Sequence, residues 1–150
     1  MDSRANLLKN LDGTVSQILE IYQNMANPEM TVYENWTAKD VLAHITFWHE
    51  SFARTVRDLA NGIKPTPLKG RYSDLTQQCL HEMRPLNIET ITNRFAASHH
   101  TIQENILNIG LLLIPYKKGS RDYTPEEHLN IVNQHINDHL NDIKKADRKL

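Results

Sequence analysis

The sequence has few of the cysteines and none of the long apolar segments that mark several large protein classes. A single cysteine, Cys79, among 150 residues cannot form an internal disulfide bond. The neighbours of Cys79 include no cation that would activate its thiol, so we expect a small, buried hydrophobic side chain. The longest apolar run without glycine, residues 111–115, is far too short to cross a membrane. These shortages argue against a disulfide-stapled scaffold and against a membrane-spanning protein.

Neither sign of charge dominates the sequence. Lys and Arg total 17 and Asp and Glu total 18, which gives a formal net charge of −1 and a pI near 6.7. Such a balance provides no basic field for phosphates, so we expect no nucleic-acid partner. The N-terminus has no apolar segment of the kind found in signal peptides, and the expected location is therefore the cytoplasm.

What the sequence does contain is apolar residues at helical spacing along nearly its whole length, with no segment that alternates like a strand. We expect a first helix after Asp2 or Ser3 as the N-cap. A second helix begins after Thr37, where Asp40 at the third helical position forms a pattern similar to a capping box. It ends at residues 61–62, where a glycine can terminate a helix.

Three further helices follow in the predicted order. A short helix begins after Ser73 as its cap, and Asn87 caps a third long helix that extends to about Asn108. The last helix begins after Thr124 and continues almost to the C-terminus. Residues 115–123, between these two long helices, are expected to form a polar loop.

Four long helices and one short helix predict a single all-α domain over residues 1–150, a four-helix bundle. If the long helices alternate in direction, the second and the last run parallel. The connection between the second and the third is roughly 25 residues long and holds the short extra helix, which is more than an up-and-down bundle requires. This connection is a candidate lid, because regular structure in it is interrupted by Gly62, Pro65, Pro67 and Gly70.

Three histidines form a candidate metal site. His135 and His139 share one face of the last helix, and helical geometry places His44 beside the apolar stripe of the second helix. Three imidazoles around an ion leave one coordination position open, as in catalytic zinc sites. Because eight of 150 residues are histidine, structural histidines remain an alternative. Residues 136–138 lack the glutamate of the H-E-x-x-H helix, which excludes a zincin protease.

Five further residues are candidates to line the pocket of such a site: Trp48, Ser51, Thr55, His99 and His128. Ser51 and Thr55 share the helix face of the second-helix histidine, and His128 lies two turns before the late pair on its face. His99 lies at the rim of the apolar stripe of the third long helix. His49, in contrast, is expected to be a partly exposed helix residue.

Two stretches of the sequence also resemble a known family. Residues 36–45, Trp-Thr-Ala-Lys-Asp-Val-Leu-Ala-His-Ile, followed by Trp48, resemble the second-helix signature of the DinB/YfiT-like superfamily, whose broader relatives include the DfsB/ClbS-type proteins. Residues 135–139, His-Ile-Asn-Asp-His, resemble its fourth-helix histidine pair. The resemblance covers nearly the whole chain in order, separation and length. It implies a four-helix bundle, often dimeric, with a divalent metal held by the three histidines of the candidate site.

The resemblance also implies a type of activity. Characterised members are thiol-dependent transferases and isomerases that use low-molecular-weight thiols, and others are self-protection or hydrolytic proteins. We therefore expect a metal-dependent enzyme, a thiol-dependent transferase or a hydrolase acting on a small molecule, with Zn²⁺ or Ni²⁺ favoured and Fe or Mn as alternatives. Such an ion binds water or a thiol and lowers its pKa, and no residue is assigned as general base.

A second function stays open at this stage. The same bundle without catalysis would dimerise or sequester a small hydrophobic molecule between its helices. A homodimer is expected in either case, because Trp36, Trp48 and the apolar residues 111–114 provide more apolar surface than one small bundle readily buries.

Overall fold

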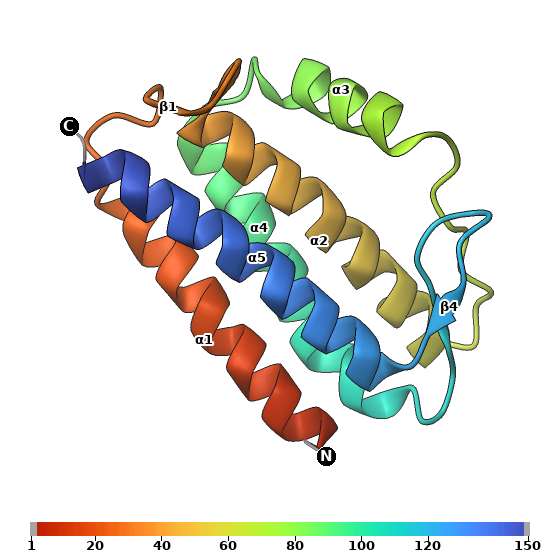
Figure 1. The fold of residues 1–150 in the computed structure, drawn as a ribbon. Coiled ribbons are helices and arrows are strands. Elements are labelled where there is room, and N and C mark those ends of the chain that lie inside the picture. The colour runs from red at the N-terminus through yellow and green to blue at the C-terminus, as the bar shows by residue number, and fades with distance from the viewer. Residues whose placement is uncertain (1–2, 149–150) are drawn as a thin grey trace.

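Four long helices form the body of the molecule, and a shorter helix lies outside them (Figure 1). The computed structural model describes residues 3–148. The helices in this range are α1 (Arg4–Gln23), α2 (Ala38–Ala60), α3 (Tyr72–Met83), α4 (Ile88–Asn105) and α5 (Pro125–Arg148), and a 3₁₀ turn, η1 (Ile106–Asn108), extends α4. The structure confirms the predicted all-α bundle with a short extra helix between the second and third long helices. None of the helices described combines the length and the apolar character that crossing a membrane requires.

Local capping chemistry explains where the long helices begin. The predicted N-cap side chains that accept a backbone hydrogen bond are Ser3, Thr37, Asn87 and Thr124. The alternative first cap, Asp2, lies outside the described residues. Ser73 does not cap α3, which begins at Tyr72 after Arg71 and has no side-chain cap. The helix thus begins two residues earlier than predicted, and its first residue, Tyr72, stacks on Trp48 of α2.

Two short hairpins correct the expectation that the chain contains no strand. β1 (Thr31–Tyr33) pairs antiparallel with β2 (Trp36–Thr37), and β3 (Ile114–Pro115) pairs with β4 (Asp122–Tyr123) within the expected polar loop. Strands of two or three residues are too short to show alternation in a sequence. The first hairpin turns at Asn35, whose positive φ of 67° suits an asparagine.

The direction of α5 relative to α2 differs from the expected arrangement. Early in α2 the ring of His44 lies 5.3 Å from that of His139, whereas two turns later the ring of Phe52 lies 4.3 Å from that of His128. Followed in one direction along the pair, residue numbers therefore rise in α2 and fall in α5. The two helices are antiparallel, and the predicted parallel arrangement is wrong.

The long connection between α2 and α4 accounts for this topology. Arg84, just before α4, contacts Asp40 in the first turn of α2, and Arg94 contacts Glu50 further along both helices. Since α2 and α4 are thus parallel, the chain must return along the 23 residues of α2, about 35 Å, before α4 begins. Residues 61–87, with α3 packed against α2, make this return (Figure 1).

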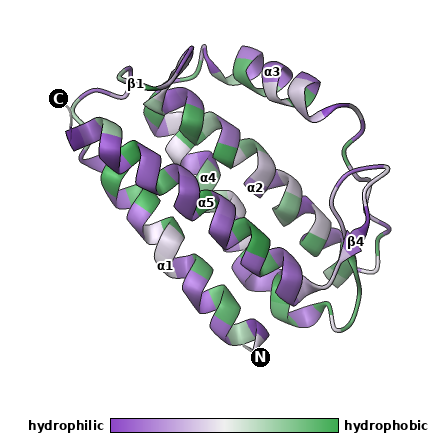
Figure 2. Cartoon of the chain, viewed as in Figure 1, coloured by the Kyte–Doolittle hydropathy of each residue, from purple (hydrophilic) through white to green (hydrophobic). Residues whose placement is uncertain are grey.

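The core lies between the four long helices. In Figure 2, apolar and polar residues alternate in bands along each of them, as amphipathic helices require. Fully buried side chains come from all four: Leu11, Leu42, Phe95, Leu129 and Ile143. Cys79 of α3 is also buried, at 1% exposure, as the sequence predicts.

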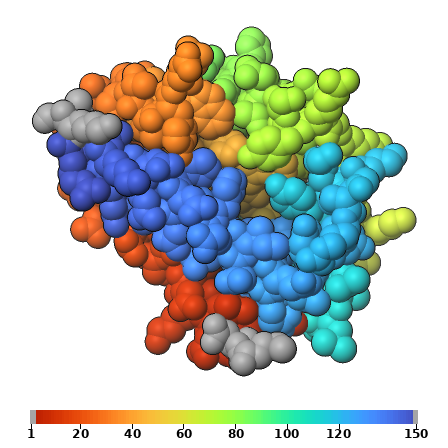
Figure 3. All heavy atoms as spheres, viewed as in Figure 1, coloured from red at the N-terminus to blue at the C-terminus, as the bar shows by residue number. Residues whose placement is uncertain are grey.

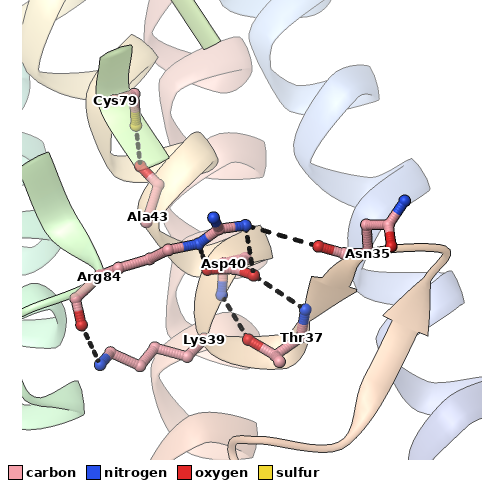
Figure 4. A network of polar contacts seen from close by, with 7 residues as sticks. All are labelled: Asn35, Thr37, Lys39, Asp40, Ala43, Cys79 and Arg84. Atoms are coloured by element: carbon pink, nitrogen blue, oxygen red, sulfur yellow. Dashed lines mark hydrogen bonds and ion pairs between the residues drawn. The ribbon is translucent and has the colours of Figure 1, made fainter. Parts of the chain in front are cut away.

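A polar network fixes the first turn of α2, close to the candidate site (Figure 4). The backbone N–H of Thr37 donates to the Asp40 carboxylate and the N–H of Asp40 donates to the Thr37 hydroxyl, both over 3.1 Å, which completes the predicted capping box. Arg84 donates to the same carboxylate over 3.2 Å and to the backbone oxygen of Asn35. The network joins the β1–β2 hairpin and the end of α3 to the first turn of α2, one turn before His44.

Candidate metal centre

The three histidines singled out in the sequence converge in the structure. One nitrogen of each ring of His44, His135 and His139 lies within 4.8 Å of the corresponding atoms of the other two. The Nε2 atoms of His135 and His139, one turn apart on α5, are separated by 3.1 Å. His44 of α2 is 3% exposed, and the other two are half-buried. Antiparallel packing of α2 and α5 brings the three rings to one level of the bundle.

Tyr33 of the β1–β2 hairpin holds His139 in one orientation. Its hydroxyl donates to Asp142 Oδ2 over 2.6 Å and therefore accepts from His139 Nδ1, which lies 2.9 Å away. A neutral imidazole that carries its proton on Nδ1 has a free lone pair on Nε2, the atom that faces His135. The sequence analysis missed both residues. Asp142, one helical turn after His139, was visible in the spacing, whereas nothing local indicated Tyr33.

Tyr72 of α3 occupies the other side of His44. Its hydroxyl lies 3.1 Å from His44 Nε2, and its ring stacks on Trp48 at a centroid distance of 5.3 Å and an interplanar angle of 11°. Tyr116, from the β3–β4 hairpin, stacks on the same indole at a centroid distance of 5.3 Å. Three aromatic rings from separate elements thus form a wall that begins at the histidine cluster.

Burial keeps the three imidazoles neutral. Desolvation, reinforced by the two neighbouring histidines, lowers the pKa of His44 to about 3. Desolvation and the proximity of His135 lower the pKa of His139 to about 4, against an opposing effect of Asp142 and Asp138. The pKa of His135 is lowered by burial as well. Neutral imidazoles are the form that binds metal ions.

The arrangement suits a divalent ion with a preference for nitrogen ligands. The three imidazoles are neutral, and the lone pair of His139 is fixed. His44 Nδ1 is buried and has no hydrogen-bond partner among the described residues. These features fit an ion held by three protein ligands. Tyr33 and Asp142 supply the outer hydrogen bonds that orient metal-ligating histidines in proteins.

Two cavities meet at the cluster. The first, which we call the His44 cavity, has a volume of about 480 Å³ and is lined by all three histidines, Tyr33 and Tyr72. The second, the Trp48 cavity, has a volume of about 470 Å³ and lies between α2, α5 and the β3–β4 hairpin. His135 and Tyr72 line both cavities. In Figure 3, a hollow between α5, α3 and this hairpin has α2 at its floor.

Four of the five candidate pocket residues line the Trp48 cavity: Trp48, Ser51, Thr55 and His128. His99 lines neither cavity and instead contacts His49 and Asp12. His49, expected at the surface, is 1% exposed and forms part of the cavity wall. The expectation was wrong because α2 packs against α4 as well as α5, and His49 faces α4.

The predicted lid, the connection between α2 and α4, reaches the two cavities through its helix α3 and not through the loop before it. Residues 62–70 line neither cavity, whereas the start of α3 lines both through Tyr72. The loop is tied to the β3–β4 connection, since the N–H of Lys118 donates to the backbone oxygen of Leu68 and the ammonium of Lys117 donates to that of Gly70.

The fold is shared with solved enzymes. The crystal structure of the mycothiol-dependent maleylpyruvate isomerase superposes with a TM-score of 0.75 at 14% identity, and a histidine-to-alanine mutant of that isomerase with 0.73 at 13%. Each comparison covers 94% of this chain and 60% of the other, so the chain spans about 60% of the length of these structures. At this level of identity the likeness shows the fold alone, which agrees with the all-α bundle predicted from the sequence. No family model and no curated protein matches the sequence.

We predict that acid destabilises the protein through its buried histidines. Burial lowers the pKa of His128 to about 4, whereas the same group in the unfolded chain titrates near 6.5. Above pH 6.5 His128 is neutral in both the folded and the unfolded chain, so its contribution to the stability of the protein is fully present. As the pH falls from 6.5 toward 4, His128 binds a proton in the unfolded chain but not in the folded chain. The free energy of unfolding therefore falls by about 3 kcal/mol over this window.

Chemical denaturation between pH 7.5 and 4.5, with a chelator present, measures this effect. His128→Gln should lower the pH dependence of the free energy of unfolding by nearly one proton, about 1.4 kcal/mol per pH unit. His100→Gln changes an exposed histidine and should preserve the wild-type slope. Equal slopes for wild type and His128→Gln would contradict the prediction.

Proposed function

We propose that this protein is a metal-dependent enzyme that acts on a small molecule with a low-molecular-weight thiol as co-substrate. The observation that carries the proposal is the convergence of His44, His135 and His139, with Tyr33 and Asp142 orienting one of them. The shared fold with a mycothiol-dependent isomerase supports the thiol part of the proposal. A thiol-dependent transferase is our first choice of reaction class, and a metal-dependent hydrolase is the second.

In this proposal the three histidines hold Zn²⁺ or Ni²⁺, with Fe or Mn as alternatives. The ion, when bound, lowers the pKa of a coordinated thiol or water so that a nucleophile forms near neutral pH. Tyr33 and Asp142 keep the lone pair of His139 directed at the ion. Tyr72 lies where the two cavities meet, so its hydroxyl can donate a hydrogen bond to a molecule that enters from the Trp48 cavity.

The Trp48 cavity is the proposed position of the small molecule. A volume of about 470 Å³ lies within the range of small-molecule sites, about 300–1,000 Å³. Apolar and aromatic side chains make up most of its wall, and they exclude water from a bound ligand. The same features would serve a non-catalytic bundle that sequesters a ligand, so metal binding decides between the two functions.

We predict that the wild-type protein binds Zn²⁺ or Ni²⁺ and that His135→Ala largely abolishes this binding. An ion at 100 times its Kd adds about 2.7 kcal/mol to the stability of a protein that binds it only when folded. Thermal unfolding with and without the ion, combined with calorimetric titration, measures both quantities. His100→Ala serves as a control, because this exposed histidine lies outside the cluster. Equal responses of wild type and His135→Ala would leave the sequestering bundle as the better interpretation.

A second prediction concerns the hydrogen bond that orients His139. Tyr33→Phe keeps the ring but removes the hydroxyl that accepts from His139 Nδ1, so the metal Kd should rise about 10- to 100-fold. Tyr123→Phe removes a hydroxyl from the other hairpin and should leave the Kd unchanged. Competition with a chromophoric chelator gives both constants. An unaltered Kd in Tyr33→Phe would show that the hydroxyl does not orient the ligand.

We further propose a cytoplasmic homodimer, with its contact at the end of α4. Trp48 and Ile114 are buried and no longer argue for an interface, but Leu111 is 94% exposed, and Leu107, Leu112 and Leu113 are about half exposed. Exposed leucines in this number favour self-association. Light scattering at micromolar concentration should give twice the chain mass, and Leu111→Glu should return the protein to a monomer. A monomeric wild type would refute the dimer.

A further inference from the structure

Two loop segments that meet beside the Trp48 cavity carry an excess of positive charge. Residues 62–71 and 115–123 contain six of the 17 Lys and Arg residues of the chain but only one of its 18 acidic residues, Asp122. The chain as a whole has a formal net charge of −1, so positive charge is concentrated in these segments. The six basic residues are Lys64, Lys69, Arg71, Lys117, Lys118 and Arg121.

Backbone contacts hold the two segments together. The N–H of Lys118 donates to the backbone oxygen of Leu68 over 2.8 Å, and Leu68 forms an isolated parallel bridge with Lys117. The ammonium of Lys117 donates to the backbone oxygen of Gly70 over 2.9 Å, which ties the hairpin to the start of α3. The basic residues at or next to these contacts are Lys69, Arg71, Lys117 and Lys118, and we call them the cationic rim.

The cationic rim has no counter-charge within the described part of the chain. None of its four side chains forms an ion pair there, whereas Arg121 is paired with Glu127. Lys117 is half-buried, and the other three are exposed. An ammonium has three hydrogens to donate, and Lys117 uses one of them on Gly70. Like charges held together repel one another, so an anion that binds at the rim relieves this repulsion.

The cationic rim continues directly from the wall of the Trp48 cavity. Tyr72 follows Arg71 and Tyr116 precedes Lys117, and both tyrosines line the cavity and stack on Trp48. The rim therefore begins one residue beyond the wall on two elements, α3 and the β3–β4 hairpin. In Figure 3 the hollow above α2 lies between these elements, with α3 in yellow-green and the hairpin in light blue. A ligand whose body lies in the cavity can thus have one end at the rim.

The wall of the cavity has a different character from the rim. The described residues that line it include no Lys or Arg, and the one acidic residue, Asp138, lies on α5 between His135 and His139. An anionic group placed inside would lose its hydration without gaining a counter-charge. At the histidine cluster it would also meet the charge of Asp138. An anionic ligand therefore fits in one direction only, with its charged end at the rim.

Tyr72 determines the distance between the rim and the histidine cluster. Its backbone lies two residues after Gly70, which the ammonium of Lys117 contacts, and its hydroxyl lies 3.1 Å from His44 Nε2. The rim and the cluster are therefore separated by about the length of one tyrosine side chain. A molecule that lies along the ring of Tyr72 has its charged end at the rim and its other end beside the cluster.

We propose that the Trp48 cavity binds an amphiphilic anion. Its apolar body lies against the rings of Tyr72, Trp48 and Tyr116, its anionic group lies at the cationic rim, and its uncharged end faces His135. As a statement about the substrate of an enzyme the inference rests on the proposed function, and the uncharged end is then the one that reacts. The binding of such a molecule requires no metal ion.

Three probes with the same apolar body test the ligand class: 3-phenylpropionate, 3-phenylpropanol and 3-phenylpropylamine. They end in an anion, a neutral hydroxyl group and a cation. NMR titration of protein freed of metal by chelation and dialysis, following the Trp48 indole, should give a Kd for the anion about tenfold lower than for the alcohol in dilute buffer. The amine should bind most weakly. The inference is overturned if the alcohol or the amine binds as tightly as the anion.

Salt and a truncated probe separate the contributions of the rim and of the cavity. At about 0.5 M salt the preference for the anion over the alcohol should fall below about threefold, because salt screens exposed charges. Acetate carries the anionic group without the apolar body, and a tenfold excess of it should displace little 3-phenylpropionate. A preference that is unchanged by salt, or full displacement by equimolar acetate, would contradict the proposed binding mode.

Matched variants test the rim itself. Lys69→Gln combined with Lys118→Gln removes two charges and leaves the cavity wall intact, so the preference for the anion should fall to less than about threefold while the Kd of the alcohol stays unchanged. Lys9→Gln combined with Lys144→Gln makes the same charge change at exposed sites on α1 and α5 and should retain the full preference. Both double variants keep Lys117, which joins the two loops. An undiminished preference in the first variant would refute the role of the rim.

The outcomes for this inference and for the proposed function are separable. Anion selectivity in a protein that binds no metal ion would count against the proposed function alone. Metal binding without anion selectivity would count against this inference alone.

Discussion

Antiparallel packing of α2 against α5 is the contact on which the site depends. Because the two helices run in opposite directions, the first turns of α2 meet the later turns of α5, where His44 reaches His135 and His139. Further along, Phe52 of α2 meets His128 near the start of α5. One helix pair thus provides both the histidine cluster and the floor of the adjoining Trp48 cavity, and a parallel pairing would separate them.

The burial of neutral imidazoles imposes a second constraint, and the protein meets it twice in the same way. Each buried ring must have its two nitrogens assigned, one as donor and one as acceptor. At His139 the assignment comes from Asp142 through Tyr33, and at His49 it comes from Asp12 through His99. In both series of hydrogen bonds the outermost group is a carboxylate, and it determines which nitrogen of the innermost histidine keeps its lone pair. His139 and His49 are thereby each oriented by a residue on another element, Tyr33 of β1 and His99 of α4.

The errors of the sequence analysis share a physical origin. The strand pairs escaped notice because two or three residues carry no periodicity. His49 was expected at the surface because a single apolar stripe was read along α2, whereas α2 packs against three other helices and is buried on several sides. Ser73 was expected to cap α3, but the helix begins at Tyr72, whose ring stacks on Trp48 of α2. In each case a contact between distant segments decided the outcome.

By itself the sequence determined the long helices, their caps and the faces that carry the histidines. Capping boxes at Thr37 and Thr124 and the four-residue spacing of His135 and His139 act within one or two helical turns, so local pattern encodes them. Only the tertiary structure decided that His49 and His99 meet, and that antiparallel helices bring the three predicted histidines to one level. The roles of Tyr33, Asp12 and His49 follow from helix direction and from the return of the chain through α3, which depend on the packing of the whole core and leave no mark in local spacing.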